Sequence, residues 1–175
     1  MNIKITADST CDLSPAELQR YNIDIFPLEV IIDGQAFLDG VDVNPNDIIK
    51  SVEKEKKSCS TSAVSIGRYL EKFEEYAGEY DAVIQICIGD KFSSCYKNAL
   101  IAAEEFDNVY VVDSMNLSSG QGGLVLYACE LAHSGFEPDE IVRILNETAE
   151  RVRFSFITAD LNICSGEGGA VWPRP

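Results

Sequence analysis

Serine, threonine and aspartate side chains follow several apolar segments that we expect to form strands. They lie in four stretches, Asp8-Ser9-Thr10, Gly89 to Ser94, Asp113-Ser114 and Ser118-Ser119-Gly120. In an open α/β sheet, ligands bind beyond the carboxyl ends of the strands, so these stretches should meet at one edge. Thr61 and Ser62 join them if their loop folds over the same edge. Hydroxyls and free N–H groups at helix N-termini can hold an oxyanion without lysine or arginine, and the spacing therefore predicts a site for a small anion or carboxylate.

Two other serines have a simpler explanation. Ser14 precedes Pro15 and Glu17, and Ser65 precedes a helical pattern, which is typical of residues that cap the first turn of a helix. Capping explains single hydroxyls well. It explains less well why several separate loops carry hydroxyls toward one edge, so the anion site remains the preferred interpretation.

Three aspartates in the same loops allow a second chemistry. Asp8, Asp90 and Asp113 could gather around a divalent cation, as in enzymes that transfer phosphoryl groups. Asp8 and Asp113 could equally orient neighbouring hydroxyl and N–H groups, and we favour that role. A metal-dependent phosphoryl-transfer enzyme or phosphatase that uses Asp8 and Asp113 is the alternative hypothesis.

Other enzyme classes lack a necessary part. His133, the single histidine, lies near the end of a predicted helix, which leaves Ser93 and Ser114 without a triad base, and no Gly-x-Ser-x-Gly turn is present. The glycine-rich stretch at residues 120–123 lacks the Gly-Lys-Ser/Thr of a phosphate-binding loop. We interpret it as a segment that needs backbone freedom and close packing. We predict no metal site, no cofactor and no catalytic residue.

The amino-acid composition disfavours some classes of binding partner and indicates the cellular compartment. The 14 lysines and arginines form no long stripe and face 29 acidic residues, a net charge of -15, which disfavours nucleic acid. No apolar run approaches the roughly 20 residues of a membrane span, and the first residues do not form a signal peptide, so we expect a cytoplasmic protein. The cysteines contain no C-x-x-C pair and are most simply reduced thiols. They are Cys11, Cys59, Cys87, Cys95, Cys129 and Cys164.

Apolar segments alternate with helical patterns, which predicts an α/β fold with a mainly parallel sheet flanked by helices. We expect strands at residues 3–7, 25–32, 82–88, 109–112 and 153–158, and helices at about 15–21, 44–52, 66–76, 93–106, 123–132 and 138–152. Asp33-Gly34 predicts a small antiparallel hairpin that ends with residues 35–38. We expect one α/β domain over residues 1–160, followed by a junction and tail at 161–175.

The order and spacing of these motifs resemble the N-terminal part of the DegV family up to about residue 160. The motifs are Asp8-Ser9-Thr10 with Asp12-Leu13, Pro27-Leu28 with Asp39, Thr61-Ser62 with Ser65, Ser93 with Tyr96 and Ala99, and Asp113-Ser114 with Ser119-Gly120 and Gly122. The resemblance implies a carrier that holds the carboxylate of a long-chain fatty acid through serine and threonine hydroxyls. It also implies a partner, a separate fatty acid kinase that phosphorylates the bound carboxylate.

The resemblance also implies site residues. The family's carboxylate-binding Thr-Ser motif falls on Thr61 and Ser62, and its Ser-Gly-Thr loop falls on Ser93-Ser94-Cys95. Thr61 and Ser93 then donate hydrogen bonds to the carboxylate. We also place Ser62, Ser9 and Ser94 in the ligand-binding set, where Ser62 and Ser9 support the loop. The supporting residues, of which Asp8 and Asp113 orient neighbouring groups, are Asp8, Asp113, Ser114, Ser119 and Gly120.

The chain departs from the family pattern at several positions. Ser94 and Cys95 replace Gly and Thr, residues 63–64 replace Gln-Pro, and Ala7 replaces the usual Thr before Asp8. These changes bear on the ligand geometry and on the preferred acyl chain.

The length is a larger departure. Family members resembling this chain carry a second α/β domain, and the acyl chain lies between the two. The family's junction corresponds to residues 168–171 here, and residues 172–175 do not match the family. We therefore expect a truncated or reframed product, or an artificially chosen chain end. Because one domain would leave an acyl chain largely uncovered, we expect weak fatty acid binding by the monomer and self-association through exposed apolar surface.

Overall fold

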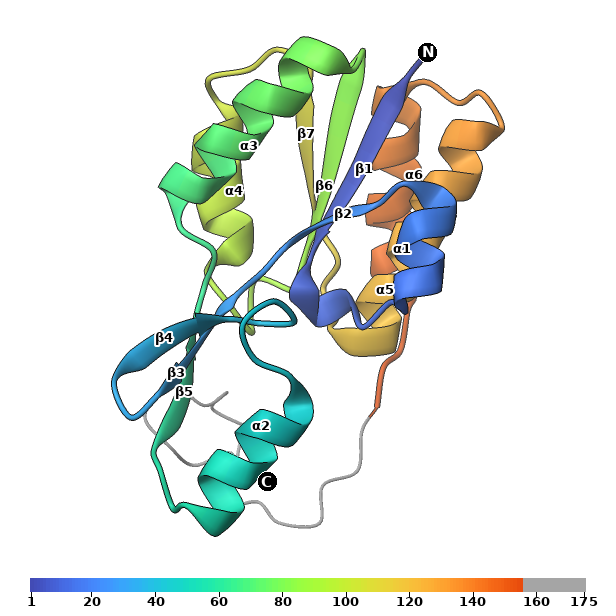
Figure 1. Cartoon of the computed structure of the whole chain (residues 1–175). Coiled ribbons are helices and arrows are strands. Elements are labelled where there is room, and N and C mark those ends of the chain that lie inside the picture. The colour runs from blue at the N-terminus through green and yellow to red at the C-terminus, as the bar shows by residue number, and fades with distance from the viewer. Residues whose placement is uncertain (156–175) are drawn as a thin grey trace. The chain divides into compact units, whose positions relative to one another are not determined.

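The computed structural model describes residues 1–155, which fall into two compact units. The larger unit comprises Met1–Phe26 and Val64–Phe154, and the smaller one contains Pro27–Ala63. Figure 1 shows the elements of both units along the chain. The predicted boundary at residue 160 and the predicted junction and tail lie outside the described residues.

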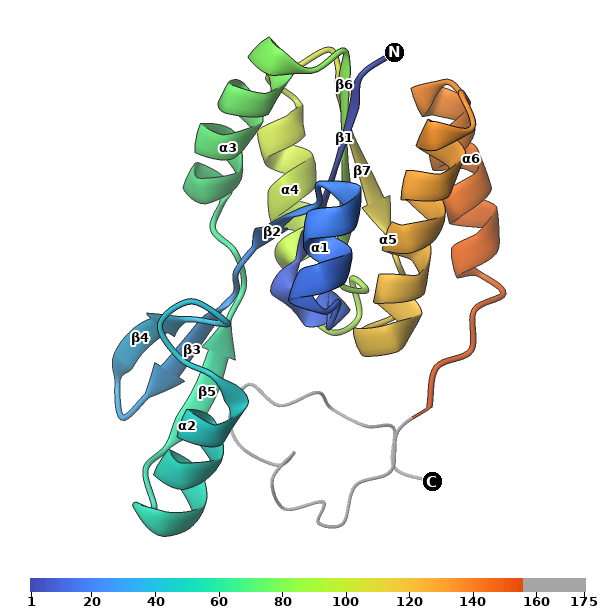
Figure 2. The ribbon, with the colours of Figure 1, turned by 45° about the vertical axis from the view of Figure 1, so that its right-hand side comes forward.

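A four-stranded sheet of order β2-β1-β6-β7 forms the centre of the larger unit, and all neighbouring strands run parallel. The strands are β1 (Ile3–Asp8), β2 (Asp24–Phe26), β6 (Ala82–Cys87) and β7 (Val109–Asp113). The helices are α1 (Pro15–Tyr21), α3 (Ile66–Glu79), α4 (Cys95–Ala103), α5 (Ser118–His133) and α6 (Pro138–Ala149). Helices α1, α5 and α6 cover one face and α3 and α4 the other, as Figures 1 and 2 show. The predicted α/β fold with a mainly parallel sheet flanked by helices is confirmed.

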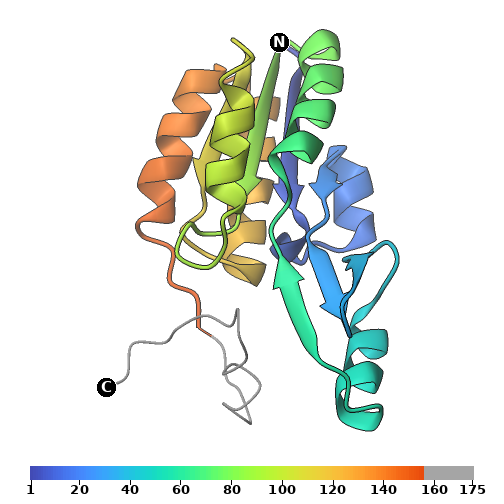
Figure 3. The same cartoon turned by 90° about the vertical axis from the view of Figure 1, so that its left-hand side faces the viewer.

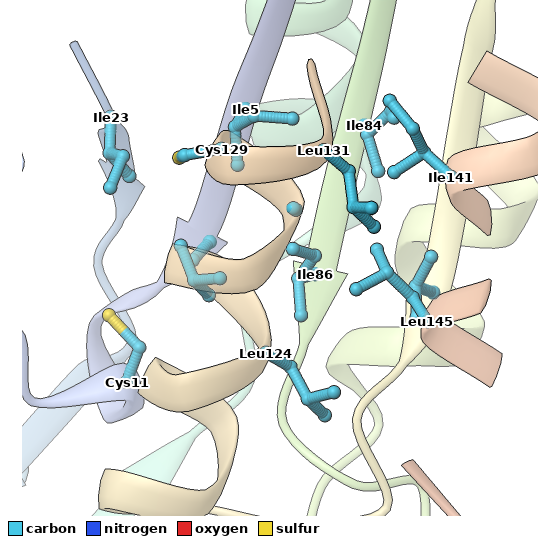
Figure 4. Packing of buried hydrophobic residues seen from close by; sticks show 14 of the residues in the cluster. Ile5, Cys11, Ile23, Ile84, Ile86, Leu124, Cys129, Leu131, Ile141 and Leu145 are labelled. Atoms are coloured by element: carbon cyan, nitrogen blue, oxygen red, sulfur yellow. The ribbon is translucent and has the colours of Figure 1, made fainter. Parts of the chain in front are cut away.

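The main core lies between this sheet and helices α5 and α6 (Figure 4). Ile84 and Ile86 of β6 pack with Leu124 of α5 and with Ile141 and Leu145 of α6. Every residue of β6 is buried, because a central strand of a parallel sheet is covered on both faces. This packing fixes the carboxyl end of β6, where the candidate site begins.

The two serines interpreted as caps do cap helices. The Ser14 hydroxyl accepts a hydrogen bond from the Glu17 N–H, and the Glu17 carboxylate accepts one from the Ser14 N–H. The Ser65 hydroxyl accepts a hydrogen bond from the Arg68 N–H at the start of α3. Both interpretations are confirmed.

The smaller unit contains a three-stranded antiparallel sheet of order β4-β3-β5, which Figure 3 also shows. Its elements are β3 (Glu29–Ile32), β4 (Gln35–Leu38), β5 (Cys59–Ser62) and α2 (Pro45–Ile49), which continues into a π-helical segment at Lys50–Lys54. Asp33 and Gly34 both have positive φ, 52° and 83°, as a two-residue hairpin turn with right-handed strand twist requires. The predicted hairpin is confirmed.

Two predictions in this region were wrong. Residues 25–32 do not form one strand but divide between β2 and β3, because Pro27 lacks the N–H that a continuous ladder needs. The polar stretch at 58–62 is not a loop, since Cys59–Ser62 pairs with β3 as a strand. Its backbone forms the ladder although its side chains are small and polar, so periodic hydrophobicity gave no signal.

Two predictions near the C-terminal half also need correction. Helix α5 begins at Ser118 rather than at residue 123, so Ser119 and Gly120 belong to its first turn and not to a loop. Residues 153–155 belong to no strand, and the rest of the strand predicted at 153–158 lies outside the described residues.

The described part of the chain contains no helix long and apolar enough to cross a membrane. Its cysteines are free thiols, as predicted, and Cys164 lies outside it. They are Cys11, Cys59, Cys87, Cys95 and Cys129.

Candidate functional site

The carboxyl ends of three parallel strands place most of the predicted polar stretches at one edge of the larger unit. Asp8, Cys87 and Asp113 are the last residues of β1, β6 and β7, and Cys87 pairs directly with Asp113. Thr61 and Ser62 end strand β5 of the smaller unit. Because Thr61 and Ser62 belong to a different unit from the three strand ends, it stays a prediction that they share a site with Ser93.

Backbone hydrogen bonds join the loop after β6 to the loop after β7. The Gly89 N–H donates to the Asn116 carbonyl at 2.8 Å, and the Ser114 N–H donates to the Cys87 carbonyl at 3.1 Å. A Cβ on Gly89 would lie 2.9 Å from the Met115 carbonyl carbon, so only glycine fits this approach. The two loops consequently form one rigid structure.

Asp113 organises this structure through backbone contacts. Its Oδ1 accepts hydrogen bonds from the N–H groups of Met115 at 2.8 Å and Asp90 at 3.2 Å. Met115 has a φ of 54°, which a residue with a side chain rarely adopts and which the surrounding contacts must hold. A pocket of about 160 Å³ lies here, lined by Gly89, Asp90, Lys91, Asp113 and Met115.

The loop after β7 then leads tightly into α5. Buried Ser114 donates from its hydroxyl to the Asn116 carbonyl at 2.9 Å and accepts from the Asn116 N–H at 3.2 Å. Gly120 packs on Asn116, where a Cβ would approach the Asn116 Cβ to 2.9 Å. Ser114 and Gly120 thus shape the backbone, and Ser119 lies exposed in the first turn of the helix.

Asp8 is fully buried, and its oxygens are occupied by the protein itself. Its carboxylate accepts from the Tyr69 hydroxyl at 2.6 Å, the Gln85 amide at 2.9 Å and the Ile88 N–H at 2.8 Å. Burial raises the pKa of Asp8 to about 7, although the hydrogen bonds from Tyr69 and Ile88 partly offset this effect. Asp8 therefore holds the start of the loop that carries Ser93 rather than facing a ligand.

The aspartates do not gather around a metal position. The part of the chain that the structure describes contains no group of three or more histidine, cysteine, aspartate or glutamate side chains able to hold an ion. Asp90 forms an ion pair with Lys97 at 2.9 Å, while Asp8 and Asp113 bind donors of the protein. Because these carboxylates already bind groups of the protein, their geometry does not support the hypothesis of a metal-dependent phosphoryl-transfer enzyme.

Ser93 carries a half-buried hydroxyl at this edge. Its Oγ accepts from the Cys95 N–H at 3.3 Å and donates to the Cys95 sulfur at 3.2 Å. Exposed Ser94 stands at the N-cap of α4 without a side-chain capping bond. Burial raises the pKa of the Cys95 thiol, so Cys95 is a neutral thiol and not an activated nucleophile.

Sequence reasoning missed two residues of this region, Tyr69 and Gln85. Helical spacing places Tyr69 in the core, and its ring is fully buried, but its hydroxyl binds Asp8. Gln85 offered a signal, since it is the one polar residue within the apolar run of β6. A buried amide in such a strand needs partners, and it finds Asp8 and Thr6.

The sequence profile of the DegV family, described as uncharacterised proteins, matches residues 2–164. This chain belongs to the DegV family. A DegV domain-containing protein of Clostridium acetobutylicum is 37% identical over 153 residues, which cover 86% of this chain and 55% of that protein. A homologue from Staphylococcus aureus is 32% identical over 159 residues, covering 90% and 57%. The chain thus spans about half the length of the curated relatives it matches.

Solved structures of DegV proteins share the fold. A DegV family protein from Thermus thermophilus, described by its fatty acid binding, superposes with a TM-score of 0.80 at 30% identity and covers 86% of this chain and 54% of that one. DegV of Bacillus subtilis, a fatty-acid-binding protein, gives a TM-score of 0.80 at 28% identity with the same coverage. A stearic-acid-binding protein from Eubacterium ventriosum gives 0.75 at 28% identity, covering 82% and 52%. The DegV resemblance is confirmed, and these DegV relatives bind fatty acids.

Proposed function

We propose that this chain is a fatty-acid-binding carrier whose Ser93 hydroxyl binds the acyl carboxylate. The observation that carries the proposal is the half-buried Ser93 hydroxyl at the carboxyl edge of the sheet, in a loop that Asp8 holds from β1 and that is joined to the loop after β7. A hydroxyl that accepts a backbone N–H can turn its own proton toward a carboxylate. The fatty acids named for DegV relatives give the ligand class.

The resemblance supplies the finer parts of this proposal. Thr61 donates a second hydrogen bond to the carboxylate, and Ser62, Ser9 and Ser94 support the two hydroxyl loops. The ligand is a long-chain fatty acid, and the partner is a separate fatty acid kinase that receives the presented carboxylate. A kinase partner places this role in the cytoplasm.

A carrier fits the described residues better than an enzyme. His133 lines a pocket with Met1, Asn2 and Ile3 at the amino end of β1, opposite the edge that carries Ser93. Ser93 contacts a neutral thiol rather than a base. The arrangement can therefore bind an oxyanion but offers it no proton acceptor at Ser93 for nucleophilic attack.

Ser93→Ala is expected to reduce co-purifying fatty acid by about 10- to 100-fold, since a hydrogen bond to a charged group contributes roughly 1.5–3 kcal/mol. Native mass spectrometry of the purified protein, with organic extraction of bound lipid, measures this loss. Thr61→Ala should reduce the bound lipid in the same way. Ser14→Ala removes a hydroxyl that only caps α1 and is the matched control. Equal lipid in Ser93→Ala and wild type would contradict the proposal, as would an empty wild type that binds no added palmitate.

Magnesium is expected to leave the thermal unfolding temperature of the wild type unchanged, because the acidic side chains of the site are occupied by protein donors. Thermal shift measurements with Mg²⁺ and with EDTA at matched ionic strength test this expectation. A dose-dependent rise that disappears in Asp8→Ala would instead favour the phosphoryl-transfer alternative.

A further inference from the structure

The side chain of Asn98, on α4, holds the chain just before α3 begins. Its Nδ2 donates to the Val64 carbonyl at 2.8 Å, across 34 positions of sequence. Val64 is only 2% exposed, so its carbonyl depends on a donor from the protein. Asn98 and Val64 both belong to the larger unit, and this hydrogen bond therefore lies within one compact body.

This hydrogen bond is made where the chain returns from the smaller unit. Val64 is the first residue of the larger unit after that return. It follows closely on Thr61 and Ser62, the last residues of β5. Asn98 lies on the helix that begins directly after the Ser93 loop. One side-chain hydrogen bond thus joins the two stretches of chain that carry the hydroxyls proposed to bind the carboxylate.

The chain leaves the larger unit at Phe26, and this crossing is held in a different way. The Phe26 ring packs on the rings of Tyr69 and Phe73 of α3, with centroid distances of 4.9 Å and 5.6 Å. Phe26 is 2% exposed, so apolar packing keeps it in place whether or not Asn98 is present. Loss of the Asn98 hydrogen bond should therefore loosen only the crossing that follows Thr61.

We propose that Asn98 is a positioning residue that acts through Thr61. By holding the Val64 carbonyl, Asn98 restricts the backbone that follows Thr61. The Thr61 hydroxyl then loses less conformational freedom when it binds the acyl carboxylate, and this raises the affinity. The inference rests on the proposed function, and it adds to it a residue that touches no ligand.

Asn108 provides a matched control at the other end of α3. Its Nδ2 donates to the carbonyls of Ala77 and Tyr80, at 3.1 Å each. Asn98 and Asn108 thus make the same kind of part-buried hydrogen bond to backbone carbonyls, one just before α3 and one around its end. Removal of either amide should lower the stability, whereas only removal of the Asn98 amide should lower the affinity for the ligand.

Calorimetric titration of the full chain with sodium laurate tests the inference. Asn98→Ala is expected to raise the Kd about 2- to 10-fold, which corresponds to the net contribution of one neutral hydrogen bond. Asn108→Ala should leave the Kd within about twofold of the wild type. The effect of Asn98→Ala should vanish in a Thr61→Ala background, where no hydroxyl remains to be positioned. Equal losses in Asn98→Ala and Asn108→Ala, or an Asn98→Ala effect of the same size with and without Thr61, overturn the inference.

The outcomes separate this inference from the proposed function. No laurate binding, or binding unaffected by Ser93→Ala, overturns the proposed function. Binding that needs Ser93 but is unchanged in Asn98→Ala overturns the positioning role alone. If Asn98→Ala does not fold, hydrogen exchange of the wild-type side-chain amides, followed by ¹⁵N NMR, decides. Because coupling is reciprocal, saturating laurate should slow the exchange of the Asn98 amide and not that of Asn108. Unchanged exchange at Asn98 overturns the inference.

Discussion

Raising the pH from 4.5 to 8 is expected to lower the free energy of unfolding of the wild type, relative to Asp8→Asn, by roughly 3 kcal/mol. Burial raises the pKa of Asp8 from 3.8 to about 7 in the folded protein. Between these values the folded state holds a proton that the unfolded state has lost, so stability falls as the pH rises through this window and levels off above about 7. A tenfold difference in proton affinity is worth about 1.4 kcal/mol.

Urea unfolding of both proteins across this pH range, at constant ionic strength, measures the effect. The comparison matters because a net charge of -15 adds its own pH-dependent repulsion, which both proteins share to within the single charge of Asp8. The new amide side chain of the Asp8→Asn variant can keep the bond from the Ile88 N–H through its oxygen and donate to a turned Gln85 amide, so folding should survive. Parallel stability curves for the two proteins would show that Asp8 does not titrate in this range.

Local signals in the sequence predicted much of the larger unit. The apolar run at 82–88 predicted β6, and Ser14 with Pro15 and Glu17 predicted the start of α1. Both signals depend on residues that are neighbours in the chain. Strand β5 gave no such local signal, because its pairing with β3 comes from backbone hydrogen bonds between residues about 30 positions apart and not from its own side chains.

The candidate site, like the fold, was predictable only where the signal was local in the sequence. The polar ends of β1, β6 and β7 were predictable, since parallel strands bring their carboxyl ends to one edge. The partners of Asp8 were not, because Tyr69 and Gln85 lie 61 and 77 positions away in sequence. The helical spacing of apolar residues correctly placed Tyr69 in the core, but it did not indicate that the Tyr69 hydroxyl binds Asp8. The buried hydrogen bonds that hold Asp8 become visible only once α3, β1 and β6 are packed together.

Gly122→Ala is expected to lower the free energy of unfolding by about 2 kcal/mol. A Cβ at this position of α5 would lie 2.5 Å from the Cys11 carbonyl oxygen, which belongs to the backbone of the turn after β1 and cannot rotate away. Overpacking of this kind costs roughly 1–3 kcal/mol or more, and the gain in helix propensity from glycine to alanine returns only about 1 kcal/mol. Urea unfolding of the variant measures the net loss.

Gly123→Ala, one residue further along the same helix, separates close packing from helix propensity. A Cβ there meets nothing within 4 Å, so this variant should be more stable than the wild type by up to about 1 kcal/mol. The two variants should therefore differ by about 3 kcal/mol although the chemical change is identical. If both stabilise the protein equally, then α5 does not pack against the turn at Ser9–Cys11, and the Thr10 hydroxyl would not be held on Gln121 at 2.8 Å. A loss in Gly122→Ala alone would show that the stretch at 120–123 carries glycine for the close approach of two backbones at the edge that holds Ser93.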